Sequence, residues 1–519
     1  MVRFRTKDKP PNLNETAFGV AWIGRDRRPR GTGGTRGTGG MEEESDERTG
    51  SVVTGIDSAV RTQLVDLVGP THVITDPDMR ATYEVDWTRR WTGSASVVVR
   101  PADAAELSGV LGVCHRHRLD CVPQGGRTGL VGGSVPMDGN VAISLERLNR
   151  VEAVDPSVGW LTAGAGVTLA ELHRQAADAG WAFGVDLAAR DSATVGGMVA
   201  TNAGGLRVIR FGQMRSQVIG LEFVLADGTI VRRLEGPAKD NAGYDLSQLM
   251  VGSEGTLGIV TAARLRLVRE LPVRATAMIG LEQLRQGIDI VGQLRRSAAS
   301  LEAAEVFDAA AMDAVSTRLG TQPPMAGYPW YLIVECAGDE DPSPSMAEAL
   351  AQYEGKSGVG GGSGVAVATD LTARSRLWAF RDQITESIAQ VGVARKLDPG
   401  IPLDRLPDFT EEVRHTVAAV APSASVYIFG HLGEGNLHVN VLGLDDEDDR
   451  VDGAVFELVA SLGGSIGSEH GMGRAKARWL TLARSAGEIE TMRAIKGALD
   501  PLGILNRGVI FPNPPLSGS

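Results

Sequence analysis

The segment PQGGRTGLVGGSVP, residues 123–136, places five glycines between two prolines, directly after an expected strand. Backbone N–H groups of such a loop can point inward together and bind a diphosphate, an approach that side chains would block. Two further glycine blocks stand beside expected strands, DSATVGGMVATNAGG (191–205) and GSEGTLGI (252–259). A lone glycine loop is usually a turn. Three such blocks with Thr, Ser and Asn donors predict a site for a bulky, phosphate-bearing cofactor.

Two common nucleotide-binding motifs are excluded. Gly164 and Gly166 open a dinucleotide fingerprint, but Leu169 stands where its third glycine is required. The chain also has no GxxxxGK[ST] phosphate loop. The expected cofactor is therefore not held by a nicotinamide-type Rossmann motif.

The composition narrows the class of protein. With 519 residues the chain is long enough for two or three domains, and its net charge of −12 argues against nucleic acid as a partner. Its three cysteines include no CxxC pair, which argues against an iron–sulfur cluster and fits a reducing cytoplasm. No apolar run approaches the roughly 20 residues of a transmembrane helix. Residues 1–50 are expected to be disordered, and Met41 is a candidate start codon.

The order of expected elements gives an α+β protein. Residues 94–126 are typical of strand, helix and strand, residues 216–233 of a hairpin, and residues 255–268 of another strand. Residues 377–388, LWAFRDQITESI, are expected to form one helix with Arg381 and Thr385 on the same face. The chain beyond about residue 440 is expected to be mostly helical. The predicted parts are a tail (1–50), a cofactor domain (51–270), a substrate or cap domain (271–450) and a C-terminal helical segment (451–513).

The segment GHLGEGNLHVN, residues 430–440, holds two of the eight histidines. As strand, turn and strand it places Asn436, His438 and Asn440 on one face, with His431 converging from the other side of the turn. Glu469 and His470 follow in the glycine-flanked loop SEHGMGRAK. Two histidines and a carboxylate are a catalytic metal set, and zinc, Mn²⁺ or Fe²⁺ would accept it. The alternative is that His438 is an ordinary buried strand residue and His431 a turn residue.

The three glycine blocks resemble the FAD-binding domain of the vanillyl-alcohol oxidase / p-cresol methylhydroxylase superfamily, in the correct order from about residue 94 to 268. This resemblance implies a two-subdomain FAD-binding domain. Some members of this superfamily attach FAD covalently through a histidine in the loop that matches residues 123–136. No histidine lies there in this chain, so the FAD is expected to be non-covalent. The resemblance implies that the FAD-binding residues are Pro123, Gly125, Gly126, Arg127, Thr128, Gly129, Ser134, Thr194, Gly196, Gly197, Asn202, Gly204, Gly205, Glu254, Gly255, Ile259 and Asn506.

The C-terminal half resembles the FAD-linked D-2-hydroxyacid dehydrogenases, through GHLGEGNLHVN and SEHGMGRAK. The resemblance implies an α+β cap domain and a helical C-terminal segment that returns to the flavin domain. It implies a divalent metal, zinc first, on His431, His438 and Glu469, with His470 as base. The implied substrate-binding residues are Arg381, Thr385, Lys396 and Asn440. The chain departs from the family at Arg507, where Asn-Pro-Gly is usual, and in residues 395–403.

The expected reaction is oxidation of a D-2-hydroxy acid to the 2-oxo acid, with the metal polarising the 2-hydroxyl and hydride transfer to flavin N5. Two cations beside a metal favour a diacid, so D-2-hydroxyglutarate comes first and D-lactate second. The alternatives are a glycolate oxidase-type flavin subunit, a flavin enzyme of the ether-lipid synthase type, and a non-enzymatic metal-binding protein. Electrons are expected to leave to an external acceptor, a quinone or an electron-transfer flavoprotein. The protein is expected to form a homodimer and to be cytoplasmic or membrane-peripheral.

Overall fold

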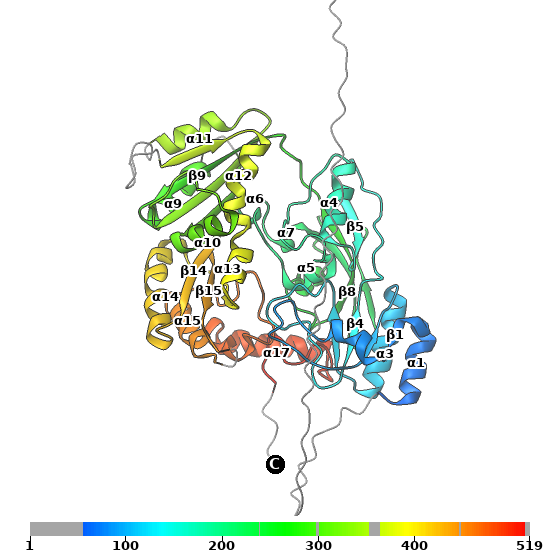
Figure 1. The fold of residues 1–519 in the computed structure, drawn as a ribbon. Coiled ribbons are helices and arrows are strands. Elements are labelled where there is room, and N and C mark those ends of the chain that lie inside the picture. Colours follow the sequence, from blue (N-terminus) through cyan, green and yellow to red (C-terminus); the bar gives the residue numbers. More distant parts are fainter. Residues whose placement is uncertain (1–55, 238, 297–299, 352–363, 446–447, 514–519) are drawn as a thin grey trace, which may run out of the picture. The chain divides into compact units, whose positions relative to one another are not determined.

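The computed structural model describes residues 56–513, apart from residues 238, 297–299, 352–363 and 446–447. The predicted tail lies outside these residues. The described chain forms three sheets with helices on them (Figure 1), which confirms the predicted α+β class. None of the described helices is long and apolar enough to cross a membrane.

The first sheet carries the first glycine loop. Its order is β1 (Val73–Ile74), β2 (Ala95–Val99), β4 (Asn140–Ser144) and β3 (Cys121–Gln124), and β2, β4 and β3 are parallel. Asp103 caps α3 (Ala104–His117), whose apolar face packs in one core with α1 (Ser58–Val68). The predicted strand–helix–strand unit of residues 94–126 is confirmed, although β4 separates its two strands. The short helix α2 (Pro77–Arg80) precedes it.

The second sheet is antiparallel and carries the other two glycine blocks. Its order is β5 (Trp160–Gly164), β8 (Ile259–Arg266), β6 (Val218–Val224) and β7 (Ile230–Arg232). The β6–β7 hairpin turns at Gly228, where φ is +91°, as predicted. Its helices are α4 (Leu169–Asp178), α5 (Val195–Thr201), α6 (Val208–Phe211), α7 (Met214–Gln217) and α8 (Leu246–Met250).

The third sheet, of seven antiparallel strands, carries the histidines. Its order is β12 (Val365–Ala368), β9 (Val273–Leu281), β11 (Trp330–Gly338), β10 (Ser300–Asp308), β14 (Ser425–His431), β15 (Asn436–Leu442) and β13 (Ala394–Leu397). One face packs in a core with α9 (Leu284–Leu294), α11 (Ser343–Leu350), α14 (Leu406–Val420) and α15 (Arg450–Ser461). The other packs with α10 (Ala309–Leu319), α12 (Leu371–Asp382) and α13 (Ile384–Val391). Figure 1 shows α14 and α13 on opposite sides of these strands.

The prediction of one helix over residues 377–388 is wrong. The helix breaks at Gln383, whose φ of −88° and ψ of 1° end α12 before α13 begins. The side chain of Arg318, from α10, hydrogen-bonds the Gln383 amide oxygen at this break. Arg381 and Thr385 therefore lie on two different helices.

The C-terminal segment makes hydrogen bonds with the glycine blocks. After α15 the chain forms a long loop and then α16 (Leu480–Ala483) and α17 (Ala486–Leu499). Glu254 accepts hydrogen bonds from the backbone N–H groups of Met472 (2.8 Å) and Gly473 (2.9 Å). Asn506 donates to the carbonyl oxygens of Gly133 (3.0 Å) and Glu254 (2.7 Å). The first and third glycine blocks and the loop after His470 are thus joined.

Candidate functional site

The glycine blocks allow close approaches between segments of the chain itself. A Cβ on Gly126 would lie 1.6 Å from the carbonyl oxygen of Ser192, and one on Gly205 would lie 1.9 Å from that of Asp186. A Cβ on Gly255 would lie 2.5 Å from Pro123. These glycines are required because the first loop packs on the second block, and the third block packs on β3. Gly129 differs, because its Cβ would meet no protein atom within 4 Å.

Several buried polar atoms in or beside these blocks have no hydrogen-bond partner in the described chain. They include Gln124 Oε1, Thr194 Oγ1 and Asn506 Oδ1. Thr194 Oγ1 lies only 2.3 Å from where a Cβ of Gly125 would stand, so this hydroxyl and the first loop face one another. An unpaired buried hydroxyl beside an open glycine loop fits a phosphate-bearing ligand.

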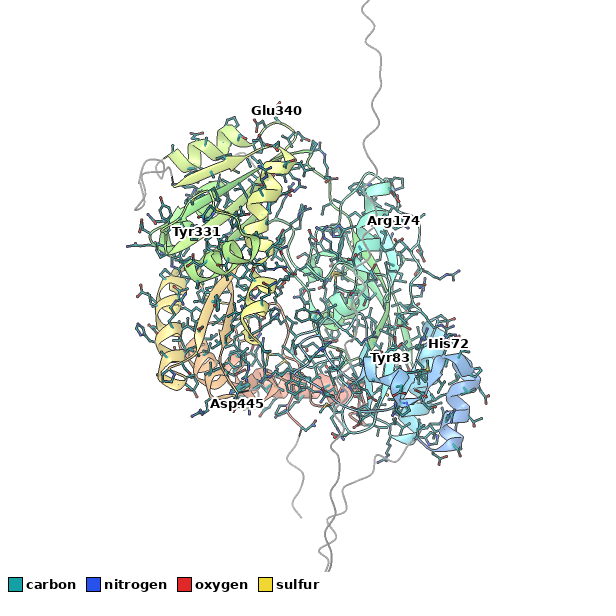
Figure 2. All side chains as sticks on the ribbon, in the orientation of Figure 1. His72, Tyr83, Arg174, Tyr331, Glu340 and Asp445 are labelled. Atoms are coloured by element: carbon teal, nitrogen blue, oxygen red, sulfur yellow. The ribbon has the colours of Figure 1, made fainter. Side chains whose placement is uncertain are left out.

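The remaining predicted FAD-binding residues either contact other parts of the protein or lie in the glycine blocks. Several use their side chains within the protein. The Arg127 guanidinium carbon lies 4.5 Å from the ring centroid of Tyr83, the tyrosine labelled near the first sheet in Figure 2. The Asn202 amide bonds the Gln213 side chain and the Arg215 N–H, and Ile259 lies in the core that the first sheet shares. Gly196 approaches Ala165, and Gly204 approaches Val208. Thr128, Ser134 and Gly197 lie in the first two blocks, and the Ser134 carbonyl accepts a hydrogen bond from Gln124.

The predicted metal ligands come together on the third sheet. His431 ends β14, His438 lies in β15 opposite Phe429, and Glu469 comes from the loop after α15. Glu469 Oε2 lies 3.3 Å from His431 Nε2 and 3.6 Å from His438 Nε2. One ligand atom from each residue lies within 4.8 Å of the others. The donor set and its spacing fit one divalent cation.

A fourth residue, Glu305, orients this triad and was missed by the sequence analysis. Its Oε1 lies 2.6 Å from His431 Nδ1, and its Oε2 accepts a 2.8 Å hydrogen bond from Arg381 Nε. His431 therefore turns Nε2 toward Glu469, in the arrangement that metal-binding histidines use. Arg381, predicted to hold substrate, has one nitrogen committed to Glu305.

The electrostatics of the triad favour a cation. Although burial opposes its charged form, Glu305 and Glu469 raise the pKa of His431 to about 10. Burial also opposes the charged form of Glu469, but His431 lowers its pKa to about 2. Burial holds the pKa of His438 well below its usual range, which keeps this imidazole neutral and able to act as a ligand. Two carboxylates thus gather negative charge where a metal would stand.

His470 and the other predicted substrate residues lie beside the triad. The His470 ring stacks on that of His438, with centroids 5.3 Å apart and planes 8° apart. Lys396 on β13 pairs in register with Asn440 on β15, two residues along from His438 on the same face. Thr385 lies on α13 and makes no side-chain hydrogen bond with a described residue.

On the face of the third sheet that carries His438, three polar groups lack a hydrogen-bond or ion-pair partner in the described chain. His438 Nδ1 and Asn440 Nδ2 are buried without hydrogen-bond partners. The Lys396 ammonium lies 4.6 Å from the ring of Trp87 and has no carboxylate at ion-pair distance among the described residues. Burial lowers the pKa of Lys396. The unpaired groups identify where a polar, anionic ligand fits.

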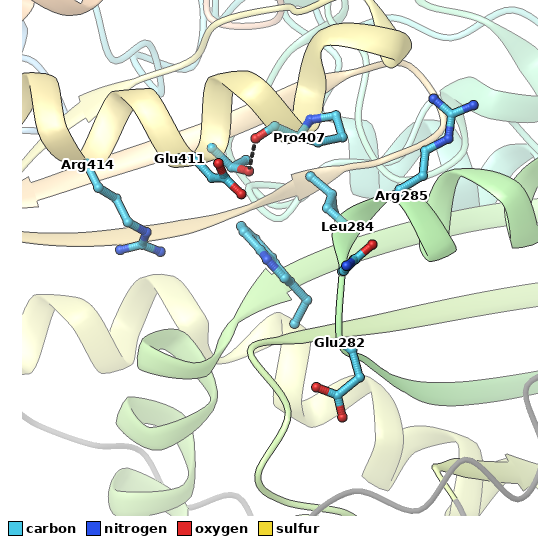
Figure 3. Close-up of a pocket in the computed structure, with 9 residues that line it drawn as sticks. Glu282, Leu284, Arg285, Pro407, Glu411 and Arg414 are labelled. Atoms are coloured by element: carbon cyan, nitrogen blue, oxygen red, sulfur yellow. Dashed lines mark hydrogen bonds between the residues drawn. The ribbon is translucent and has the colours of Figure 1, made fainter.

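A separate pocket contains none of these residues. Figure 3 shows it at the beginning of α9 and along α14, on the sheet face opposite the histidines. Its lining residues are Glu282, Gln283, Leu284, Arg285, Trp330, Pro407, Thr410, Glu411 and Arg414. None of the residues predicted to bind metal, substrate or cofactor lines this pocket, so it is not part of the candidate site.

Comparison with known proteins matches both halves of the chain. Residues 95–233 match the family described as "FAD binding domain", and residues 271–510 match "FAD linked oxidases, C-terminal domain". The mitochondrial D-2-hydroxyglutarate dehydrogenase of Danio rerio is 35% identical over 446 residues, covering 84% of this chain and 82% of that protein. The D-2-hydroxyglutarate dehydrogenase of Xanthomonas citri is 37% identical over 450 residues, covering 84% and 93%.

Among solved structures, the chain is similar in fold to p-cresol methylhydroxylase with substrate bound. The TM-score is 0.68 at 16% identity, covering 88% of this chain and 96% of the other. This likeness confirms the fold predicted from the glycine blocks.

The surroundings of Gly126 and Gly129 predict two distinct effects of substitution. Gly126→Ala should lower both the melting temperature of the flavin-free protein and the flavin bound per chain, because its Cβ meets the Ser192 carbonyl. Gly129→Ala should lower flavin content alone, because its Cβ meets only the space left for a ligand. Flavin absorbance measures the flavin bound per chain, and thermal melting with and without flavin measures the stability of the protein.

The matched control is Gly497→Ala on α17, an exposed position whose Cβ also meets nothing within 4 Å. It should leave the flavin content unchanged and raise the melting temperature slightly, because alanine is more favourable than glycine inside a helix. Full flavin occupancy in Gly129→Ala would contradict the placement of the cofactor against this loop.

Proposed function

Since the chain belongs to the FAD-linked D-2-hydroxyacid dehydrogenases of the vanillyl-alcohol oxidase / p-cresol methylhydroxylase superfamily, we propose that it oxidises D-2-hydroxyglutarate to 2-oxoglutarate. The observation that carries this substrate is the set of unpaired groups on one sheet face, Lys396, Asn440 and His438, beside a triad suited to a metal. Lys396 is half-buried, and an ammonium held partly out of water without a carboxylate partner is costly, so a substrate carboxylate would supply that partner.

In the proposed site, His431, His438 and Glu469 hold one divalent metal. Zinc is first, and Mn²⁺ or Fe²⁺ would also accept these donors. Glycine-block residues hold FAD non-covalently, since no histidine lies in residues 123–136. When bound, the metal acidifies the substrate 2-hydroxyl and the flavin N5 accepts the hydride from C2.

The chain's own groups then align the substrate and move its proton. His470 takes the hydroxyl proton. Lys396 and Asn440 hold a carboxylate, together with Thr385 and the terminal nitrogens of Arg381. Glu305 fixes the directions of Arg381 and His431 at once. Such alignment is the larger part of what the protein adds to the cofactor's chemistry.

The alternatives differ in how this face is used. D-lactate lacks the second carboxylate, so it would leave Lys396 or Arg381 without a substrate partner. The substrate of a glycolate oxidase-type subunit also has one carboxylate, so it too would leave Lys396 or Arg381 without a substrate partner. A flavin enzyme of the ether-lipid synthase type gives no role to the buried triad. Membership of an enzyme family removes the non-enzymatic alternative.

The other expected partners remain proposals. Electrons leave to an external acceptor, a quinone or an electron-transfer flavoprotein, and the chain forms a homodimer. Several relatives are named mitochondrial, and the cytoplasmic or membrane-peripheral location stays a prediction from the sequence.

The metal proposal predicts that His438→Ala loses metal and activity together, because two donors hold a divalent ion poorly. His470→Ala should keep metal and flavin yet slow flavin reduction by about 10²–10⁴, the usual contribution of positioned proton transfer. Metal analysis, flavin absorbance and anaerobic flavin reduction by D-2-hydroxyglutarate give the three readouts.

His415→Ala, on the exposed side of α14, is the matched control and should change none of them. A chelator should abolish the wild-type reaction, and added Zn²⁺ or Mn²⁺ should restore it. Rapid flavin reduction by metal-free His438→Ala protein would refute the metal role.

The substrate proposal predicts that Lys396→Met raises KM for D-2-hydroxyglutarate by roughly 10–100-fold, which corresponds to the loss of a hydrogen bond to a charged group. KM for D-lactate should change much less, since it offers one carboxylate. Steady-state kinetics with an artificial dye acceptor compares the two. An equal effect on both substrates would show that Lys396 does not recognise the second carboxylate.

A further inference from the structure

Asp398 is a buried carboxylate directly behind the proposed base. It follows β13, has an exposed fraction of 0%, and precedes Pro399. Its Oδ2 accepts hydrogen bonds from the backbone N–H groups of Glu469 (3.0 Å) and His470 (2.8 Å). Its backbone carbonyl accepts a third, from the N–H of Ser468 (3.1 Å). One residue therefore holds three consecutive residues of the loop that carries the metal ligand and the base.

The second carboxylate oxygen faces the His470 ring. Asp398 Oδ1 lies 3.5 Å from His470 Nδ1 and accepts a hydrogen bond from Lys476 Nζ. The ring is also fixed by stacking on His438. His470 Nε2 makes no hydrogen bond within the described chain, so it is the nitrogen left for a substrate.

We infer that Asp398 is a positioning residue that holds His470 in the tautomer protonated at Nδ1, with Nε2 free to accept the substrate proton. A carboxylate oxygen accepts but does not donate, so the imidazole nitrogen beside it must carry the hydrogen. The inference rests on the proposed function, in which His470 is the base. The 2-hydroxyl O–H bond breaks and its proton goes to Nε2, while the C2 hydride and its electron pair go to FAD and a carbonyl forms.

Lys476 explains how this carboxylate is kept buried. Lys476 is 2% exposed and its ammonium pairs with Asp398 Oδ1, which offsets the cost of removing both charges from water. Removing Asp398 alone would leave a buried ammonium. The test therefore uses Asp398→Asn and also the neutral pair Asp398→Asn/Lys476→Met, which leaves no unpaired charge if the single variant does not fold.

Asparagine keeps an oxygen for the backbone N–H groups but presents N–H donors as well. A donor turned toward His470 Nδ1 favours the tautomer protonated at Nε2, which cannot accept a proton there. Both variants should therefore slow anaerobic flavin reduction by D-2-hydroxyglutarate by about 10²–10⁴. Metal content, flavin content and the affinity for 2-oxoglutarate, measured by flavin spectral change, should stay close to the wild-type values, because the asparagine oxygen can still accept the N–H groups of Glu469 and His470 that hold the loop.

A double-mutant cycle with His470→Ala separates this role from a structural one. If Asp398 acts through His470, then adding the neutral pair to His470→Ala costs no further rate, whereas a structural role would give additive losses. Additive losses, a normal rate in the neutral pair, or loss of metal with rate would each overturn the inference. A fast His470→Ala single variant would instead refute the base in the proposed function.

Discussion

The buried carboxylate of Glu305 carries the charge balance on which the candidate site depends. It joins His431 to Arg381, so two groups that are proposed to touch metal and substrate share one anion. A buried charge without a partner costs several kcal/mol, so each ionised group on this sheet face must be matched. At Lys396 and Asn440 the described chain leaves a charged group without a carboxylate and a buried amide nitrogen without a hydrogen-bond partner. This is the reason for proposing that a substrate carboxylate binds there.

Local features of this site could be predicted from the sequence. The strand–turn–strand of residues 425–442 follows from period-2 alternation around a glycine turn, and it places His438 and Asn440 on one face. The break at Gln383 was not predicted, and the side chain of Gln383 bonds Arg318, 65 residues away, a contact that the local sequence does not contain. Helical spacing over residues 377–388 is compatible with one helix or two, and tertiary contacts select between them.

Glu305 and Asp398 were missed for a related reason. Their partners come from other segments, 126 residues away for His431 and 71 or more for the loop at Glu469. The sequence does hold a weak signal, since each acid has apolar neighbours, in SLEAAEVFD and KLDPGI, and the structure places it in or beside a strand. A charged residue on the buried side of a strand requires a partner, but which partner depends on the sheet pairing.

The proposed reaction needs a hydride acceptor and a proton acceptor aligned on one substrate carbon, and the chain links the two by hydrogen bonds. Glu254, in the third glycine block, binds the N–H groups of Met472 and Gly473, directly after His470. Asn506 binds the Glu254 carbonyl and the first glycine block. A displacement of the loop that carries the proposed base would therefore also displace the glycine blocks that are proposed to hold the cofactor. Near-attack geometry tolerates only small errors, so this coupling keeps both acceptors in register.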